Sequence, residues 1–397
     1  MAKDINVTGV KIFTSHPKIS SYAAPTADAE YAPKKYVDDS IPLGHLLGDA
    51  SETEGPGTAP DVTIAGGDFA YGLGTMSGQT LTMARDLYCR NLTINSGYTL
   101  KPNGFKIFCT GTLLNNGTIE RWGNAGSAGA VGEAEGGGGL GGAGGTALAA
   151  GTLPGALAGV VGQEGGQTYG ADNGGAAVAG INGVAVTHSI LSGTAKVGGT
   201  AGGGGGNAAA GVPGASANPG TAGSITSVDE NANFHDLHGL LYKGLEQDAA
   251  TLYFVTLASS NGGAAGGGGG ANTDPGTLGP NGGGGGGGGG NAGLIMILCK
   301  TFTNNATITT NGGAGGIGGA GGAGGASGGG GGGGGGAGGN GGYVLIVYDS
   351  KTASGTIVAN GGAAGAGGAG GTGNDAGVNG GAGQAGLAGT VLEIEIN

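Results

Sequence analysis

The densest group of side chains that could do chemistry is His235-Asp236-Leu237-His238. On a helix, His235 and His238 would lie three residues apart on one face, where two imidazoles could bind a metal ion. Phe234 and Leu241 fall on a helical stripe with Leu237, and such a stripe is typical of a helix that packs against the rest of a fold. We therefore interpret this segment as a packing helix, and the sequence predicts no metal ion and no cofactor.

Paired carboxylates would be another route to chemistry, because enzymes that cleave polysaccharides use two carboxyl groups at a fixed separation. The candidate residues are Asp68, Asp86, Glu120, Asp172 and Asp236. No spacing among them singles out a pair. Matches to GxGxxG occur throughout the chain because glycine is so frequent, and none has the strand-to-helix context and acidic partner of a dinucleotide site. The sequence therefore predicts a protein that is not an enzyme.

Glycine dominates the composition. It occupies 108 of 397 positions (108/397, about 27%), whereas an average protein has about 7%. Charged residues make up only 10% of the chain, and such low charge argues against ordinary disorder. The net charge is −12, so the surface repels nucleic-acid phosphates, and no nucleic acid is expected as a partner.

Neither a secretory signal nor a membrane span is expected. Residues 1–10 contain no apolar stretch, and no run of 18 apolar residues occurs in the chain. Cys89, Cys109 and Cys299 are far apart and lack metal-ligand spacing, so we interpret them as reduced, half-buried core residues. These features predict synthesis in a cytoplasm and no insertion into a membrane.

Residues 61–122 carry the pattern of short β-strands. The apolar pairs that alternate with polar residues are Val62 with Ile64, Leu81 with Met83, Leu92 with Ile94, and Ile107 with Cys109. Turn signals recur at residues 95–97, 103–104 and 115–117. Short strands with turns at this spacing indicate an all-β unit, and both a sandwich and a β-solenoid fit the pattern.

Beyond residue 122 the chain repeats itself. Leu294 and Tyr343 begin similar apolar strands, and 343 − 294 = 49 residues separate them. The same interval separates Ile308 from Ile357. Residues 105–119 open the same unit, and further apolar strands are expected at residues 252–257 and 391–396. A fixed period of this size predicts stacked units that bury their strands on one another.

The glycine tracts between these strands admit three interpretations. A flexible linker is the usual one for such composition. Collagen requires abundant proline, but the chain has only 12 prolines. The third interpretation is ordered polyglycine, in which neighbouring tracts hydrogen-bond to one another.

The spacing of the non-glycine residues favours ordered polyglycine. Residues 311, 314, 317, 320 and 323 carry side chains, with two glycines between each pair. Residues 360, 363, 366, 369 and 372 repeat the pattern, which only Ala364 interrupts. Three residues per turn is the period of the polyproline-II conformation, so the side chains of one tract should line a single edge. The bare edges let other tracts approach until backbone N–H and C=O groups pair, because this conformation has no internal hydrogen bonds.

Two segments resemble known families. Residues 91–100, followed by Asn116-Gly117-Thr118-Ile119, are similar to a segment that precedes the glycine tracts of glycine-rich phage virion proteins. Lys34-Lys35-Tyr36-Val37-Asp38-Asp39 resembles a short motif common near the attachment ends of phage tail-fibre proteins. The second resemblance implies that Lys34, Lys35, Tyr36 and Val37 contribute to attachment to other virion proteins.

The tract architecture is similar to that of the adhesins at the long-tail-fibre tips of T-even-like phages. This resemblance implies a polyglycine-II bundle whose variable loops contact a host receptor. The β-rich residues 61–122 and the short apolar strands depart from those adhesins. The departure leaves open whether the protein is mounted on the tail or on the capsid.

Receptor contact is expected where the repeat is interrupted, because loops on a rigid scaffold usually carry function. The interruptions are residues 177–197 and 224–261. Aromatic side chains beside polar ones suit sugar or protein surfaces. The receptor-contact candidates are Tyr169, His188, Phe234, His235, His238 and Tyr242.

The sequence thus predicts an all-β protein in three parts: an attachment segment (1–60), a β-rich domain (61–122) and a polyglycine-II/β repeat domain (123–397). We expect a structural phage protein located in the virion, a tail fibre or adhesin that binds a glycan or outer-surface protein of the host. The alternatives are a capsid-decorating head fibre and a tailspike depolymerase. Fibres of phages are usually trimers, so a homotrimer is expected.

Overall fold

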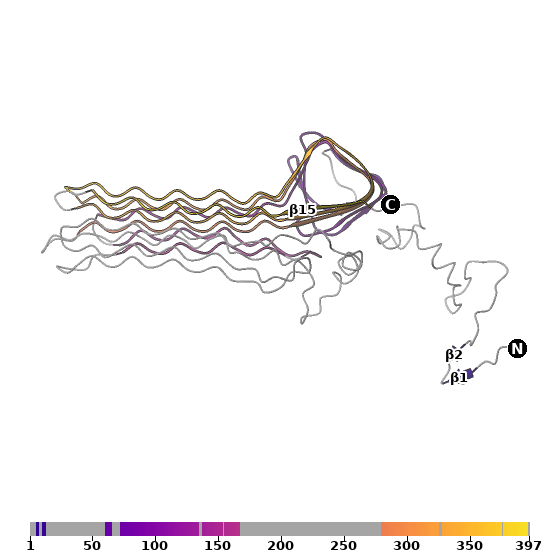
Figure 1. Cartoon of the computed structure of the whole chain (residues 1–397), viewed down its shortest axis with the longest axis horizontal. Coiled ribbons are helices and arrows are strands. Elements are labelled where there is room, and N and C mark those ends of the chain that lie inside the picture. The colour runs from indigo at the N-terminus through magenta and orange to yellow at the C-terminus, as the bar shows by residue number, and fades with distance from the viewer. Residues whose placement is uncertain are drawn as a thin grey trace. The chain divides into compact units, whose positions relative to one another are not determined.

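A computed structural model describes residues 5–7, 10–12, 60–65, 72–134, 137–153, 155–166, 279–324, 328–374 and 376–395 (Figure 1). The chain divides into two compact units, residues 1–59 and 60–397. In the first unit, strands β1 (Ile5–Val7) and β2 (Val10–Ile12) pair antiparallel. The sequence patterns used above did not predict this hairpin.

The second unit contains the remaining strands. They are β3 (Val62–Ile64), β4 (Gly74–Ser77), β5 (Thr80–Met83), β6 (Leu87–Cys89), β7 (Leu92–Ile94), β8 (Thr99–Lys101), β9 (Ile107–Asn115), β10 (Thr118–Glu120), β11 (Leu294–Asn304), β12 (Thr307–Thr309), β13 (Tyr343–Ala353), β14 (Thr356–Val358) and β15 (Thr390–Glu395). The described residues contain no helix, and hence none long and apolar enough to cross a membrane. The all-β class expected from the sequence is confirmed for this part of the chain.

These strands form two sheets. One sheet has seven strands in the order β15-β13-β11-β9-β7-β3, with β6 also paired to β9; the other has six in the order β14-β12-β10-β8-β5-β4. All neighbours in both sheets run parallel except β4 and β5. Parallel neighbours need a long connection, which the glycine tracts provide between the later strands. We call the two sheets together the strand stack.

The register of the strand stack follows the sequence repeat. Leu294 lies opposite Tyr343 and Ile308 opposite Ile357, so the predicted interval of 49 residues is confirmed. Ile119 lies opposite Ile308, which confirms that the segment before residue 120 opens the same unit. The last interval is shorter, because Tyr343 lies opposite Thr390 and 390 − 343 = 47.

Apolar side chains fill the interior of the strand stack. The alternation predicted for residues 61–122 is confirmed at Val62 and Ile64, which are buried on either side of an exposed Thr63. It fails between Ile107 and Cys109, because Phe108 is apolar and also buried. The main cluster joins both sheets and includes Leu92, Ile107, Phe302, Ile308 and Ile346, all fully buried. A second cluster lies on the other face of the seven-stranded sheet, around Leu294, Met296, Tyr343, Leu345 and Val347. Burial on both faces is typical of parallel sheets.

The described glycine-rich segments lie side by side and extend away from the strand stack (Figure 1). We number them tract 1 (123–134), tract 2 (137–147), tract 3 (155–166), tract 4 (279–293), tract 5 (311–324), tract 6 (328–342), tract 7 (360–374) and tract 8 (376–389). Their backbones are hydrogen-bonded to one another. For example, Gly126 of tract 1 donates to Ala314 of tract 5, and Gly315 of tract 5 donates to Ala363 of tract 7.

Tract 4 has the most regular bonding. Successive N–H groups along it point to three different neighbours, and the direction recurs every third residue. Gly282, Gly285 and Gly288 donate to tract 3; Gly283, Gly286 and Gly289 to tract 6; and Gly284, Gly287 and Gly290 to tract 1. Tract 4 therefore lies in the interior of a bundle, with other tracts around it.

Within the bundle, tracts with more glycines per three residues are more deeply buried. Tracts 4 and 6, where glycine is nearly continuous, are buried throughout. Tracts 5 and 7, with about two glycines in three, keep their glycines buried or half-buried and expose most of the other positions. Tract 8 mostly has one glycine in three and exposes most of the remaining positions. The single exposed edge expected for tract 5 is confirmed at Ala314, Ile317 and Ala323, and Ala320 is half-buried.

Glycine is required in these tracts because of close backbone contact. A Cβ added at Gly319 would lie 1.9 Å from the carbonyl oxygen of Ala130, and one at Gly286 would lie 2.0 Å from that of Gly316. Positive φ is not the reason. The glycines with positive φ in the described residues are Gly72, Gly78, Gly97 and Gly104, all outside the tracts.

Candidate functional surfaces

The site residues expected from the sequence lie outside the described residues. This holds for the receptor-contact candidates Tyr169, His188, Phe234, His235, His238 and Tyr242. It also holds for the attachment candidates Lys34, Lys35, Tyr36 and Val37, and for the packing helix expected around residues 234–241. These expectations stay predictions.

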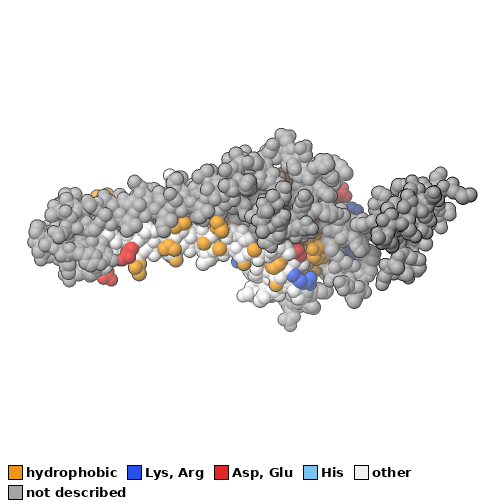
Figure 2. All heavy atoms as spheres, turned by 90° about the horizontal axis from the view of Figure 1, so that it is seen from below, with side chains coloured by type: hydrophobic (Ala, Val, Ile, Leu, Met, Phe, Trp, Pro, Cys, Tyr) orange, Lys and Arg blue, Asp and Glu red, His pale blue; other side chains and the backbone are white. Residues whose placement is uncertain are grey.

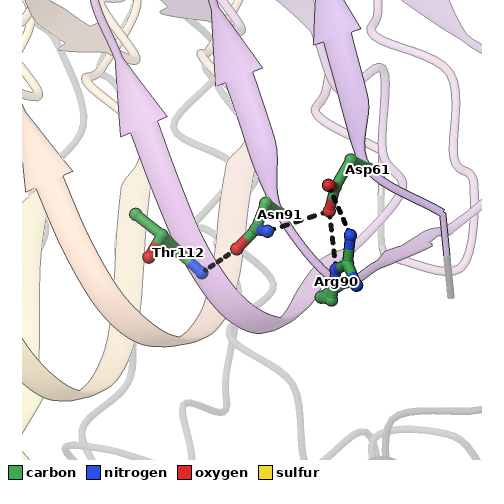
Figure 3. Close-up of polar contacts among 4 residues, drawn as sticks. All are labelled: Asp61, Arg90, Asn91 and Thr112. Atoms are coloured by element: carbon green, nitrogen blue, oxygen red, sulfur yellow. Dashed lines mark hydrogen bonds and ion pairs between the residues drawn. The ribbon is translucent and has the colours of Figure 1, made fainter. Parts of the chain in front are cut away.

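The most connected polar cluster of the strand stack lies where strands β3 and β7 begin (Figure 3). The Arg90 guanidinium donates two hydrogen bonds to the Asp61 carboxylate, at 2.9 and 2.6 Å. Asn91 donates from its side chain to Asp61 at 2.8 Å and accepts from the Thr112 N–H at 2.8 Å. These contacts connect the start of β3 to β7 and β9.

Hydrogen bonds from Arg90 lower the pKa of Asp61 to about 2, and Asn91 adds to the effect. The same pairing raises the pKa of Arg90. Asp61 therefore stays ionised at neutral pH and has no tendency to take up a proton. A carboxylate held in this way stabilises the strand ends and is unsuited to general acid catalysis.

Asp86 and Glu120, the described carboxylates among the polysaccharide-cleavage candidates, also have polar partners. Asp86 accepts hydrogen bonds from the Lys106 N–H at 2.8 Å and from the Thr152 hydroxyl at 2.5 Å. Glu120 forms an ion pair with Lys101 at 3.2 Å. Each interaction connects one strand or loop to its neighbour, which is a structural use of the charge.

The three cysteines form a column across adjacent strands. Cys89 lies opposite Cys109, and Cys109 lies opposite Cys299. All three are free, as the sequence predicted, but they are buried where half-buried side chains were expected. A hydrogen bond with Cys89, together with burial, raises the pKa of Cys109, and burial raises the pKa of Cys299 to about 12. The Cys109 and Cys299 thiols are therefore protonated at neutral pH and poorly suited to nucleophilic chemistry. The described residues contain no cluster of three potential metal ligands.

Arg121 connects the strand stack to the bundle. Its guanidinium is buried and donates to the Leu294 carbonyl at 3.0 Å and to the Ala149 carbonyl at 2.8 Å. Burial lowers the pKa of Arg121 to about 10, so the side chain stays charged at neutral pH. The neighbouring Trp122 is half exposed and donates from its indole to the Thr309 hydroxyl at 3.2 Å.

The bundle has an unusual surface. Among tracts 1 to 8, Glu133 and Glu164 are the only described residues with charged side chains. In Figure 2 the described flank of the bundle shows hydrophobic side chains among backbone and uncharged polar atoms, and acidic atoms appear near the end away from the strand stack. Large apolar side chains are exposed along it, including Val131, Leu140, Ile317 and Val378. Ile317 was expected on a tract edge, and its exposure follows from its position in the period of three.

Comparisons with known proteins give no relative from which to argue. No protein-family model, curated protein or solved structure matches the chain. The function proposed for this chain therefore rests on its geometry and on the two sequence resemblances.

Proposed function

We propose that the chain is a structural protein of a bacteriophage particle, a tail fibre or adhesin that contributes to attachment to the host surface. It is proposed to act without catalysis. The observation that carries the proposal is the hydrogen bonding of tract 4, where the direction of donation recurs every third residue. A rigid bundle of this kind suits an element that must meet a bacterial surface outside the cell.

The proposed architecture is a β-solenoid followed by a polyglycine-II bundle. Parallel, in-register strands support a solenoid over a sandwich. The period of three in tract 4, and the absence of positive φ from the described tract glycines, support the polyglycine-II conformation. A map from electron cryomicroscopy is expected to give φ near about −75° and ψ near about +145° in residues 311–326 and 360–372. Helical tracts in such a map would refute the bundle.

In this proposal the N-terminal segment binds other virion proteins. The interruptions of the repeat bind a host glycan or an outer-surface protein. Shortening residues 177–197 and 224–261 should leave folding and incorporation intact while adsorption to host cells falls. Removal of residues 1–40 should give a folded protein that is absent from particles. Normal adsorption by loop-shortened particles would exclude receptor binding by this chain.

Two related proposals need separate tests. A capsid-decorating head fibre would be labelled on the head by immunogold electron microscopy, whereas a tail fibre would be labelled on the tail. A tailspike depolymerase would release sugar from host capsule, and the adhesin would not. The proposed assembly is a homotrimer, which light scattering on the purified chain measures directly.

A further inference from the structure

The surface of the bundle includes a flat face made by tracts 1, 5 and 7. Gly126 donates to Ala314 and Gly315 donates to Ala363, so the three tracts run side by side with matched turns. The outward positions recur every third residue. They are Ala125, Ala128 and Val131 of tract 1; Ala314, Ile317, Ala320 and Ala323 of tract 5; and Ala363, Ala366, Ala369 and Thr372 of tract 7. We call this surface the alanine face.

The alanine face is apolar and carries no charge. Asn311 and Asn360 begin the rows of tracts 5 and 7; beyond them, the outward positions are all alanine except Val131, Ile317 and Thr372. Ile317 is 54% exposed and Val131 is 61% exposed, so both stand out from a layer of methyl groups. Soluble monomers rarely expose a continuous apolar patch of this kind, and such patches usually mark an interface.

We infer that the alanine face is the surface through which copies of this chain associate side by side. The inference rests on the proposed polyglycine-II bundle. The protein carries a net charge of −12, so two copies repel one another over most of their surfaces. The alanine face lacks charged side chains, and identical chains can approach along it without burying an unpaired carboxylate.

The size of the face is sufficient for this role. Tract 5 spans residues 311–324, and 14 residues at about 3.1 Å each make it about 43 Å long. Three tracts spaced like hydrogen-bonded strands, about 4.8 Å apart, make the face about 14 Å wide. One copy would therefore bury about 600 Å² and a pair about 1,200 Å², at the lower end of standard stable interfaces.

Ile317 is the expected anchor of the contact. Because its neighbours on the face are alanines, its side chain can enter the shallow space between methyl rows of another copy. A partner recognised through charge is disfavoured, since the face offers no ion pair. A lysine at position 317 would have to lose its hydration for the contact to form, which is costly.

The test is the mass of the purified full chain, measured by light scattering over a range of concentrations. The wild type should associate to a multiple of 36.7 kDa. Ile317→Lys should weaken association at least tenfold and give the 36.7 kDa monomer at concentrations where the wild type is associated. The matched control is Val378→Lys, because Val378 is 47% exposed on tract 8, outside the alanine face. This control should associate as the wild type does.

A wild type that stays monomeric, or equal weakening by Ile317→Lys and Val378→Lys, would overturn the inference. Ala366→Lys is a second variant on the same face, in case Ile317→Lys fails to fold. It should also weaken association, and unchanged association of a folded Ala366→Lys would contradict the inference. If the wild type were monomeric but still entered particles, both this interface and the homotrimer would be refuted. The proposal that the chain is a virion protein would be unaffected.

Discussion

The strand stack and the bundle are stabilised by different groups. In the strand stack, Phe302, Ile308, Ile346 and their neighbours are fully buried and form a conventional apolar core. In the interior of the bundle, tract 4 has almost no side chains, and its backbone N–H groups donate to tracts 1, 3 and 6. One chain therefore combines a fold that depends on buried apolar area with one that depends on close backbone packing and hydrogen bonds.

This difference explains how the two regions use glycine. Glycine at Gly97 and Gly104 of the strand stack provides positive φ in turns. Glycine in the bundle provides bare edges, and the number of glycines per three residues follows the number of edges that contact other tracts. Continuous glycine occurs in buried tracts 4 and 6, whereas tract 8 mostly has one glycine in three and exposes the other positions.

The largest expected effect is the loss of an apolar side chain from the strand stack. Phe302 is fully buried and stacks on Tyr348, with ring centroids 6.2 Å apart. Phe302→Ala should lower the free energy of unfolding by about 3–5 kcal/mol, because it removes apolar contacts and leaves a cavity. Denaturant unfolding followed by the fluorescence of Trp122, the single tryptophan, measures this effect. A loss below 1 kcal/mol would mean that the strand stack does not depend on its apolar core.

A somewhat smaller effect is expected from a side chain introduced between tracts. Gly319→Val would place a Cβ 1.9 Å from the Ala130 carbonyl oxygen and disturb the bond that Gly319 donates to Gly284. Overpacking costs about 1–3 kcal/mol, and a lost hydrogen bond adds about 1 kcal/mol. Ala320→Val is the matched control, since Ala320 belongs to the side-chain edge of the same tract. Equal destabilisation by the two substitutions would refute the assignment of edges.

Hydrogen exchange can localise both effects. Phe302→Ala should speed exchange mainly in the strands, and Gly319→Val mainly in the tracts. If either variant accelerated exchange equally in both regions, the strand stack and the bundle would unfold as one cooperative unit. The comparison between two separately stabilised regions would then need revision.

Much of the fold could be predicted from local patterns. The alternation at Val62–Ile64, the interval from Leu294 to Tyr343 and the exposed edge at Ala314 all follow from strict periods in the sequence. Periods could not say which tracts are neighbours, because a bare glycine edge fits any other bare edge. They also could not decide between a sandwich and a solenoid, since both bury alternate residues.

The candidate sites were predictable to a smaller extent. The residues expected to touch a receptor or the virion, such as His235 and Lys34, lie where the repeat is absent and outside the described residues. Because these segments lack the sequence repeat, the spacing of their residues does not indicate which other residues lie beside them in space. The alanine face was accessible in principle, because its residues keep the spacing of three, but the pairing of tracts 1, 5 and 7 had to be known before they formed one surface.

The smallest expected effect is electrostatic and concerns the strand stack alone. Hydrogen bonds from Arg90 lower the pKa of Asp61 from 3.8 to about 2. A carboxyl group whose pKa is lower in the folded state stabilises that state above its unfolded pKa. The contribution is therefore present at neutral pH, and it is lost as the pH falls below about 4 towards about 2. Because the pair is exposed, the effect should be small and should decrease further in high salt.

Asp61→Asn isolates this contribution. The variant should be less stable than the wild type at neutral pH, and the difference should vanish near pH 2, where the wild-type carboxyl becomes protonated. Unfolding of both proteins across this range, at low and high salt, measures the effect. Exchange in the tracts should be unchanged at neutral pH, because the described tracts lack Asp61 contacts. If the difference in stability between the two proteins persisted unchanged down to pH 2, Asp61→Asn would destabilise the fold through altered packing or hydrogen-bond geometry. The charge of Asp61 would then not stabilise the strand ends.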